Sequence, residues 1–199
     1  MSGLEAALSA LLARLADLDA RIAIVGGLAV SARTEPRFTR DADVCVAVED
    51  DLEAERLVHS LRSSGYRVIA IVEQEAIGRI ATVRLAARRD GEDGVVLDLL
   101  FASSGVEREI VASSDDMEVF DGVRAPIASV AGLIALKVLA RDDVERPQDR
   151  VDLVGLMRVA SASDLIEADR LLGLITKRGY GRGKDLEREL TDLRAETGR

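Results

Sequence analysis

Cysteine and histidine are almost absent from the sequence, which has one of each, Cys45 and His59, in 199 residues. A single cysteine excludes an intrachain disulfide. A zinc site made of cysteine and histidine side chains would need more ligands of these types than the chain contains. Any metal bound here is therefore expected to be a hard cation with oxygen ligands, Mg²⁺ or Mn²⁺.

Aromatic residues and long apolar runs are also scarce. Aromatics make up 3% of the chain and tryptophan is missing, so stacking platforms for single-stranded RNA are few. The net charge of −9 argues against non-specific binding of nucleic acid, although it leaves room for a local basic patch. No run of about 18 apolar residues is present, and the N-terminus lacks the basic start of a signal peptide. We therefore expect a cytoplasmic protein without a membrane partner.

Hydrophobic periodicity predicts an α+β fold. The expected fold is a mixed β-sheet core with flanking helices, followed by a C-terminal helical bundle, and we divide it into a domain over 1–127 and a helical region over 128–199. The pattern predicts helices at 4–18, 28–34, 50–63, 129–144, 149–160, 165–178 and 184–195, and strands at 22–25, 43–48, 66–72, 79–87 and 95–101. It also predicts a turn at 90–94 and an edge hairpin at 115–125 around Asp121-Gly122.

Three aspartates on strands are the strongest chemical signal. Asp41 and Asp43 alternate with apolar residues, so their side chains point to one face and repel each other unless a cation lies between them. Asp98 lies inside the apolar run Val-Val-Leu-Asp-Leu-Leu-Phe, where an unpaired carboxylate is costly. A metal ion shared with Asp41 and Asp43 would compensate it. The alternative is a buried ion pair with an arginine.

A glycine pair, Gly26-Gly27, follows the first expected strand. Glycine allows the backbone to approach a ligand closely, and the amides of a following helix N-terminus attract phosphate. The alternative is a tight strand-to-helix turn with no ligand.

These features together resemble the nucleotidyltransferase superfamily typified by DNA polymerase β. The shared pattern is an apolar strand, Gly26-Gly27, 13 intervening residues, Asp41-Ala42-Asp43, and a later strand with Asp98. A narrower resemblance is to the abortive-infection and toxin–antitoxin nucleotidyltransferases of the AbiEii kind. It rests on the segments 26–43, 133–141 and 146–153, with Gln148 where that family usually has lysine.

The resemblance implies a role for each residue. Asp41 and Asp43 would hold two Mg²⁺ ions against the triphosphate of an NTP, and Asp98 would bind the catalytic metal and help to deprotonate an acceptor hydroxyl. The nucleotide would also be bound by the residues Gly26, Gly27, Arg33, Arg40 and Lys137, with Arg37 nearby. The alternatives are ion pairs with Glu35 and surface acids for the arginines, and for Lys137 a position at a helix border with its ammonium in water.

Two further groups allow either a structural or a functional interpretation. Asp149 and Asp152 are one helical turn apart, and we favour pairing with Arg141 or Arg146 that holds the helical region against the first domain. Residues 170–184 contain five basic residues and no acid. They would bind RNA phosphate, with Tyr180 available for stacking, or else complement a helix C-terminus within a flexible glycine loop.

The leading hypothesis is an Mg²⁺-dependent transfer of an NMP from an NTP to a hydroxyl, with release of pyrophosphate. The family resemblance alone implies an RNA acceptor such as a tRNA end and an antitoxin protein as partner. A second hypothesis is transfer to a small molecule or a protein side chain, because an acidic cleft attracts a cationic acceptor. A third is a non-catalytic nucleotide-binding module.

Overall fold

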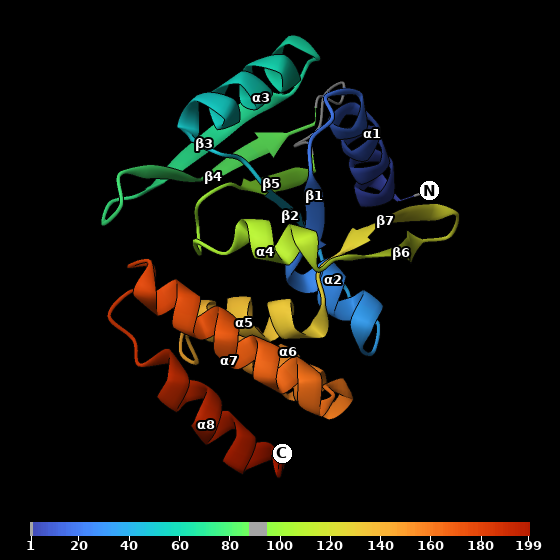
Figure 1. Ribbon diagram of the computed structural model, residues 1–199. Helices are drawn as coiled ribbons and strands as arrows, with labels where there is room; N and C mark the ends of the chain where they lie inside the picture. The colour runs from blue at the N-terminus through green and yellow to red at the C-terminus, as the bar shows by residue number, and fades with distance from the viewer. Residues whose placement is uncertain (1, 88–94) are drawn as a thin grey trace.

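The computed structural model describes residues 2–87 and 95–199. Within these ranges the chain forms a seven-stranded mixed sheet and eight helices, so the α+β prediction is confirmed (Figure 1). In chain order the elements are α1 Gly3–Asp17, β1 Ile22–Val25, α2 Gly26–Arg33, β2 Ala42–Val46, α3 Asp51–Ser63, β3 Arg67–Gln74, β4 Arg79–Ala86, β5 Val96–Leu100, α4 Glu107–Ala112, β6 Asp115–Phe120, β7 Val123–Ile127, α5 Val130–Ala140, α6 Pro147–Val159, α7 Ala162–Lys177 and α8 Leu186–Thr197.

The sheet has the strand order β3-β4-β5-β2-β1-β7-β6. Strand β2 runs antiparallel to β1 and parallel to β5, and β5 runs antiparallel to β4. The three central strands are built largely from buried valine, leucine, isoleucine and alanine, as expected for strands covered on both faces. Charged side chains on these strands are therefore exceptional, and they mark the place where the sheet opens to a cleft.

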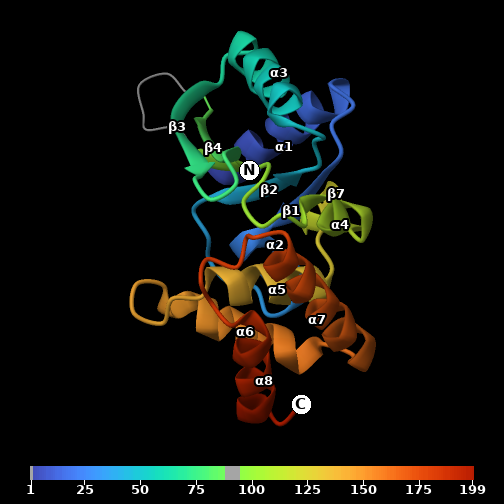
Figure 2. The same cartoon turned by 60° about the vertical axis from the view of Figure 1, so that its left-hand side comes forward.

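The C-terminal helices α5 to α8 gather on one side of the sheet, and α2 lies between them and the strands (Figures 1 and 2). Helix α5 is apolar almost all round, and Lys137 is its one charged residue. A helix of this composition belongs in a core. It packs against both α6 and α7, so it anchors the helical region, and it brings Lys137 to the face that meets the sheet domain.

Several boundaries differ from the predictions. Helix α2 begins at Gly26, so the glycines form its first turn instead of preceding it. Helix α5 ends at Ala140 because Arg141 adopts an extended conformation, and α4 was not predicted. Helix α7 begins at Ala162 and not at residue 165, because Ser161 and Asp164 form a capping box at its start.

The remaining predictions on organisation have different outcomes. The hairpin around residues 121–122 is confirmed as β6 and β7, with β6 at the sheet edge. The predicted turn at 90–94 lies outside the described residues. Across 2–87 and 95–199, no helix combines the length and the apolar character needed to cross a bilayer. The division of the chain at residue 127 stays a prediction.

Candidate functional site

A row of charged residues crosses the sheet at one level. Arg84 on β4 pairs in register with Asp98 on β5, and Asp98 pairs in register with Asp43 on β2. Residues in register on neighbouring strands point to the same face, so the three side chains lie side by side. The sequence predicted that Asp43 and Asp98 would converge, and the strand pairing brings them together.

Gly26 allows the carboxylate of Asp43 to occupy its position. Val25 is the register partner of Asp43, and Gly26 follows at once with φ +64°. A Cβ atom on Gly26 would lie 1.9 Å from Oδ2 of Asp43. Any side chain here would both collide with the carboxylate and strain the backbone. At Gly27 the nearest atom to an added Cβ is the Nη2 atom of Arg37, at 2.6 Å, which is the end of a flexible side chain.

The N-terminus of α2 starts beside this carboxylate. Its N-cap residue is Val25, which offers no side-chain acceptor to the first turn. The first amides of a helix have no partner within the helix and carry its positive dipole end. Serine or aspartate side chains cap most of the other described helices, whereas the uncapped start of α2 leaves amide donors for an anionic ligand.

Asp43 has an unusually high affinity for its proton. Burial raises the pKa of Asp43 from 3.8 to about 6, and the negative charges of Asp41 and then Asp98 add to the rise. Lys137 and Arg146 act in the opposite direction but do not balance these effects. Asp41 itself is exposed and accepts a hydrogen bond of 3.0 Å from the hydroxyl of Thr39. The cluster therefore carries negative charge that the protein only partly compensates.

Asp98 is compensated by Arg84. The guanidinium donates Nε to Oδ1 at 2.9 Å and Nη2 to Oδ2 at 2.7 Å. The Asp98 side chain is 8% exposed and that of Arg84 is 49% exposed. The hydrogen bond to Asp98, followed by its charge, raises the pKa of Arg84. This ion pair is the alternative that the sequence left open for Asp98, and its outer partner faces solvent.

Lys137 is buried in a second ionic cluster. Its ammonium lies 2.6 Å from Oδ1 of Asp149 and 2.8 Å from Oδ2 of Asp152, so it does not extend to the solvent border. Asp152 also accepts two hydrogen bonds of 2.8 Å from Arg37. Arg37, which was not among the predicted partners, thus links Asp152 of α6 to the loop before β2.

The other partners of this cluster were predicted in part. Arg146 lies 3.3 Å from Asp149, as expected. Arg141 was the other predicted partner, but it pairs with Asp143 at 2.6 Å, because α5 ends before it and turns its side chain into the following loop.

A cleft of about 720 Å³ joins the two clusters. Its walls include the predicted residues Gly26, Gly27, Asp41, Asp43, Asp98 and Lys137. They also include Arg84 and Arg146, which the sequence did not assign to a site, and Arg182 of the basic segment 170–184. In the sequence Arg84 was only one residue of an alternating strand, and its pairing with Asp98 depends on the register between β4 and β5.

Two predicted nucleotide-binding residues are not among those that line the cleft. Arg33 donates hydrogen bonds to the carbonyl oxygens of Ala128 and Ile127 and to the carboxylate of Asp115, so it ties α2 to the edge hairpin. Arg40 is exposed, and its guanidinium lies 5.9 Å from the centre of the Phe38 ring. The structure therefore does not bring Arg33 or Arg40 to the carboxylates.

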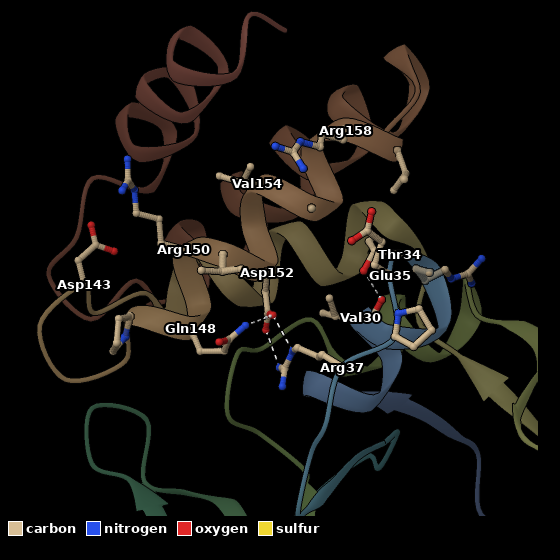
Figure 3. Close-up of a pocket in the computed structure, with 16 residues that line it drawn as sticks. Val30, Thr34, Glu35, Arg37, Asp143, Gln148, Arg150, Asp152, Val154 and Arg158 are labelled. Carbon is tan, nitrogen blue, oxygen red and sulfur yellow. Dashed lines mark hydrogen bonds and ion pairs between the residues drawn. The ribbon is translucent and has the colours of Figure 1, made fainter.

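A second hollow of about 1050 Å³ adjoins the cleft between the end of α2, the following loop and α6 (Figure 3). Arg37 stands at the junction, since it lines both hollows, and its ion-pair partner Asp152 lines the second one. Figure 3 shows Thr34 and Glu35 on one wall and Val154 and Arg158 on the other. The second hollow offers mixed apolar and charged surface next to the carboxylates.

The carboxylates are the only hard oxygen ligands that the row offers to a cation. As they stand, no three acidic, histidine or cysteine side chains of the described residues form a group that could hold a metal ion. In this arrangement Arg84 occupies both oxygens of Asp98. The donor chemistry of Asp41, Asp43 and Asp98 suits Mg²⁺ or Mn²⁺, and the uncompensated charge at Asp43 favours a cation there.

Comparison with known proteins agrees with this arrangement. A profile of the family described as nucleotidyl transferase AbiEii toxin, type IV TA system, matches residues 10–197. No curated protein matches the chain significantly.

Two solved structures share the fold. An antigenic nucleotidyltransferase-like protein from Paracoccidioides brasiliensis is 20% identical with a TM-score of 0.54, over 95% of this chain and 92% of that one. A protein from H. pylori described as a nucleotidyltransferase is 17% identical with a TM-score of 0.51, over 98% and 91% of the two chains.

Proposed function

The chain belongs to the AbiEii nucleotidyltransferase family, and from that premise we propose that it transfers an NMP from an NTP to an acceptor hydroxyl with the help of Mg²⁺ or Mn²⁺. One observation carries the proposal. Asp43 and Asp98 stand in register on neighbouring strands, and the uncapped N-terminus of α2 begins beside Asp43. Cation ligands and anion donors are thus adjacent, as a metal-bound triphosphate requires.

We assign the metal ligands to Asp41, Asp43 and Asp98. Bound metal ions would neutralise charge on the phosphates and on the attacking and leaving oxygens. Asp43 supports this assignment because it is ionised at neutral pH, above its pKa of about 6, but remains poorly compensated. Asp98 would take part once the guanidinium of Arg84 gives up at least one of its oxygens, and the exposed position of Arg84 leaves it room to move.

The protein groups around the metal ligands would orient the nucleotide. The amides of Gly26 and Gly27 would donate to phosphate oxygens, which also explains why no side chain is tolerated at Gly26. Lys137 would contribute positive charge from α5, held in place by its two aspartates. Asp98, freed on one oxygen, would accept the proton of the attacking hydroxyl.

For the acceptor we propose an RNA end, with a tRNA 3′ end as the first case to test, and an antitoxin protein as the partner that restrains the enzyme. The family description as a toxin of a type IV toxin–antitoxin system supports the antitoxin partner. The RNA acceptor is proposed on the sequence resemblance alone. A small cationic acceptor is the second candidate, and the net charge of −9 favours it.

The test is a transfer assay with each α-labelled NTP in turn, in Mg²⁺ and in Mn²⁺. Parallel reactions contain total tRNA, a mixture of aminoglycosides, or the protein alone. We expect label on RNA with the wild type and with the control Asp121→Asn, which changes an exposed turn aspartate. Asp43→Asn should abolish the label. Label on an aminoglycoside or on the protein would replace the RNA proposal, and no transfer in any reaction would overturn the proposed activity.

A further inference from the structure

The basic segment 170–184 has one residue that differs from the others. Four of its five basic residues do not line the cleft with the carboxylates. Arg170 pairs with Glu167, Arg178 pairs with Glu109, Lys184 donates to the carbonyl oxygens of Leu139 and Arg141, and Lys177 is exposed in the last turn of α7. Arg182 alone among them lines the cleft with the carboxylates.

The loop between α7 and α8 is fixed so that Arg182 reaches the cleft. Tyr180 is 6% exposed and packs on Gly105, where a Cβ atom would lie 2.4 Å from its ring. Arg178 also fixes the loop at Gly105, because it donates hydrogen bonds to the carbonyl oxygen of Gly105 and to the carboxylate of Glu109. Arg182 then has φ 55°, in the left-handed region that non-glycine residues avoid. A disfavoured conformation kept at the edge of a cleft is typical of a functional position.

The guanidinium of Arg182 has no carboxylate partner within the described ranges. It donates one hydrogen bond of 3.1 Å, from Nη2 to the carbonyl oxygen of Ser103. Its side chain is partly exposed at the cleft, and its partial desolvation, followed by the positive charge of Arg146, lowers the pKa of Arg182. Arg146 also lines the cleft, and its charge acts on Asp43 as well. Arg146 therefore lies within electrostatic reach of both Asp43 and Arg182.

The charges of the cleft are unevenly compensated. Asp43 stays poorly compensated at the strands. At the loops before α6 and α8 the wall carries Arg182, and it also carries Arg146, which pairs with Asp149 and has Glu145 beside it on the wall. Like charges in a partly desolvated cleft favour a counter-ion between them. A polyphosphate with one end at a metal ion would place its remaining negative charge beyond the carboxylates, and planar guanidinium groups bind phosphate with paired hydrogen bonds.

We propose that Arg182 and Arg146 bind the terminal phosphates of the NTP, so that the α7–α8 loop forms part of the nucleotide site. This assignment rests on the proposed function, since it needs the α-phosphate to lie at the carboxylates. It favours the nucleotide over an RNA backbone because Arg146 and Arg182 line the same cleft as the carboxylates. It also gives the C-terminal helices a role in nucleotide binding.

The test uses the full-length chain and Arg182→Gly. Glycine removes the guanidinium and accepts the left-handed backbone, so the variant should melt at the same temperature as the wild type or higher. Calorimetry with inorganic tripolyphosphate, without metal, should show an affinity loss of about tenfold or more, as expected for a charge-assisted contact. Arg182→Lys should recover part of the affinity. Arg188→Gln is the matched control, because Arg188 is a highly exposed arginine of α8.

Steady-state kinetics then separate this proposal from the proposed function. We expect Arg182→Gly to raise KM for the NTP about tenfold while the affinity for the acceptor stays at the wild-type value. Unchanged tripolyphosphate affinity and unchanged KM would overturn the proposal, even if the wild type is an active transferase. A loss confined to RNA affinity would also overturn it, and would assign Arg182 to the acceptor. An inactive wild type whose tripolyphosphate affinity still depends on Arg182 would contradict the proposed function alone.

Discussion

Replacing Asp43 by asparagine should make the protein more stable and inactive. Burial raises the pKa of Asp43 to about 6, so at neutral pH the folded protein holds a carboxylate in an environment that disfavours its charge. The carboxylate accepts no hydrogen bond from any residue in 2–87 or 95–199, so an amide of the same shape loses no such partner. The substitution removes the unfavourable charge and also removes the proposed metal ligand.

The size of the effect follows from the pKa. The rise from 3.8 to about 6 corresponds to about 3 kcal/mol of free energy of unfolding. Because the folded state binds the proton more tightly than the unfolded chain, the wild type loses this stability as the pH rises from 3.8 to 6. The advantage of Asp43→Asn should therefore be about 3 kcal/mol at pH 8 and roughly half of that at pH 5. For a chain of this length it amounts to about 6 to 12 °C in Tm at pH 8.

The assay is urea unfolding of both proteins at pH 8 and at pH 5, in buffer without divalent cations. Other titrating groups are common to the two proteins, so the difference between them isolates Asp43. A third series adds Mg²⁺ at pH 8. A cation bound by the carboxylate stabilises the folded state, so Mg²⁺ should reduce the advantage of the variant.

Two results would refute this reasoning. An Asp43→Asn protein that is no more stable than the wild type at pH 8 would show that the burial of Asp43 carries no net electrostatic cost. An advantage of the same size at pH 5 and pH 8 would show that the gain comes from packing and not from the removed charge. In both cases the argument for a cation at this position would lose its electrostatic basis.

Three other substitutions test the neighbouring contacts. Arg84→Gln leaves Asp98 without its guanidinium and should cost about 1–3 kcal/mol in urea unfolding, the lower end reflecting the solvent exposure of the arginine; an unchanged midpoint would contradict the pairing. Lys137→Met leaves two buried aspartates without their shared ammonium and should cost about 3–5 kcal/mol at pH 7, with much of the loss disappearing in acid. Gly26→Ala should destabilise the protein by more than the control Gly122→Ala, because both glycines have a positive φ but only Gly122 has open space around it. Gly26→Ala should also abolish nucleotide binding. Equal losses of stability in the two variants would show that the contact with the Asp43 carboxylate is unimportant.

The sequence predicted most of the fold because its signals are local. The strand 22–25 matches β1 residue for residue, and the helices expected at 4–18 and 50–63 are confirmed as α1 and α3. The strand expected at 79–87 is confirmed as β4, which buries Ala81, Val83 and Leu85. Short, well-capped or strictly periodic segments carry their structure in neighbouring residues, so no tertiary information is needed to find them.

The parts of the site that escaped prediction depend on pairing across the chain. Asp98 was recognised as a buried charge, but its partner is chosen by the register of β4 and β5. Arg33 was predicted to bind the nucleotide because it lies a few residues before Asp41 and Asp43 in the family pattern. The orientation of α2 instead points its side chain to Asp115 of the edge hairpin. The position of Arg182 depends on a loop held by Tyr180 and Arg178, whose contact at Gly105 is about 75 residues away.

Asp43 and Asp98 lie in register on neighbouring strands, but only Asp98 has an arginine partner for its charge. This difference gives the two carboxylates different parts in the proposed site. Asp98 is paired with Arg84, so its burial is compatible with a stable fold before any ligand arrives. Asp43 has no such partner, and the helix start beside it is uncapped. The fold therefore retains the carboxylate of Asp43 at an energetic cost, whereas the carboxylate of Asp98 is paired with the half-exposed Arg84. A fold selected for stability alone would place a neutral residue at position 43, so the retained charge is best explained by a ligand that compensates it.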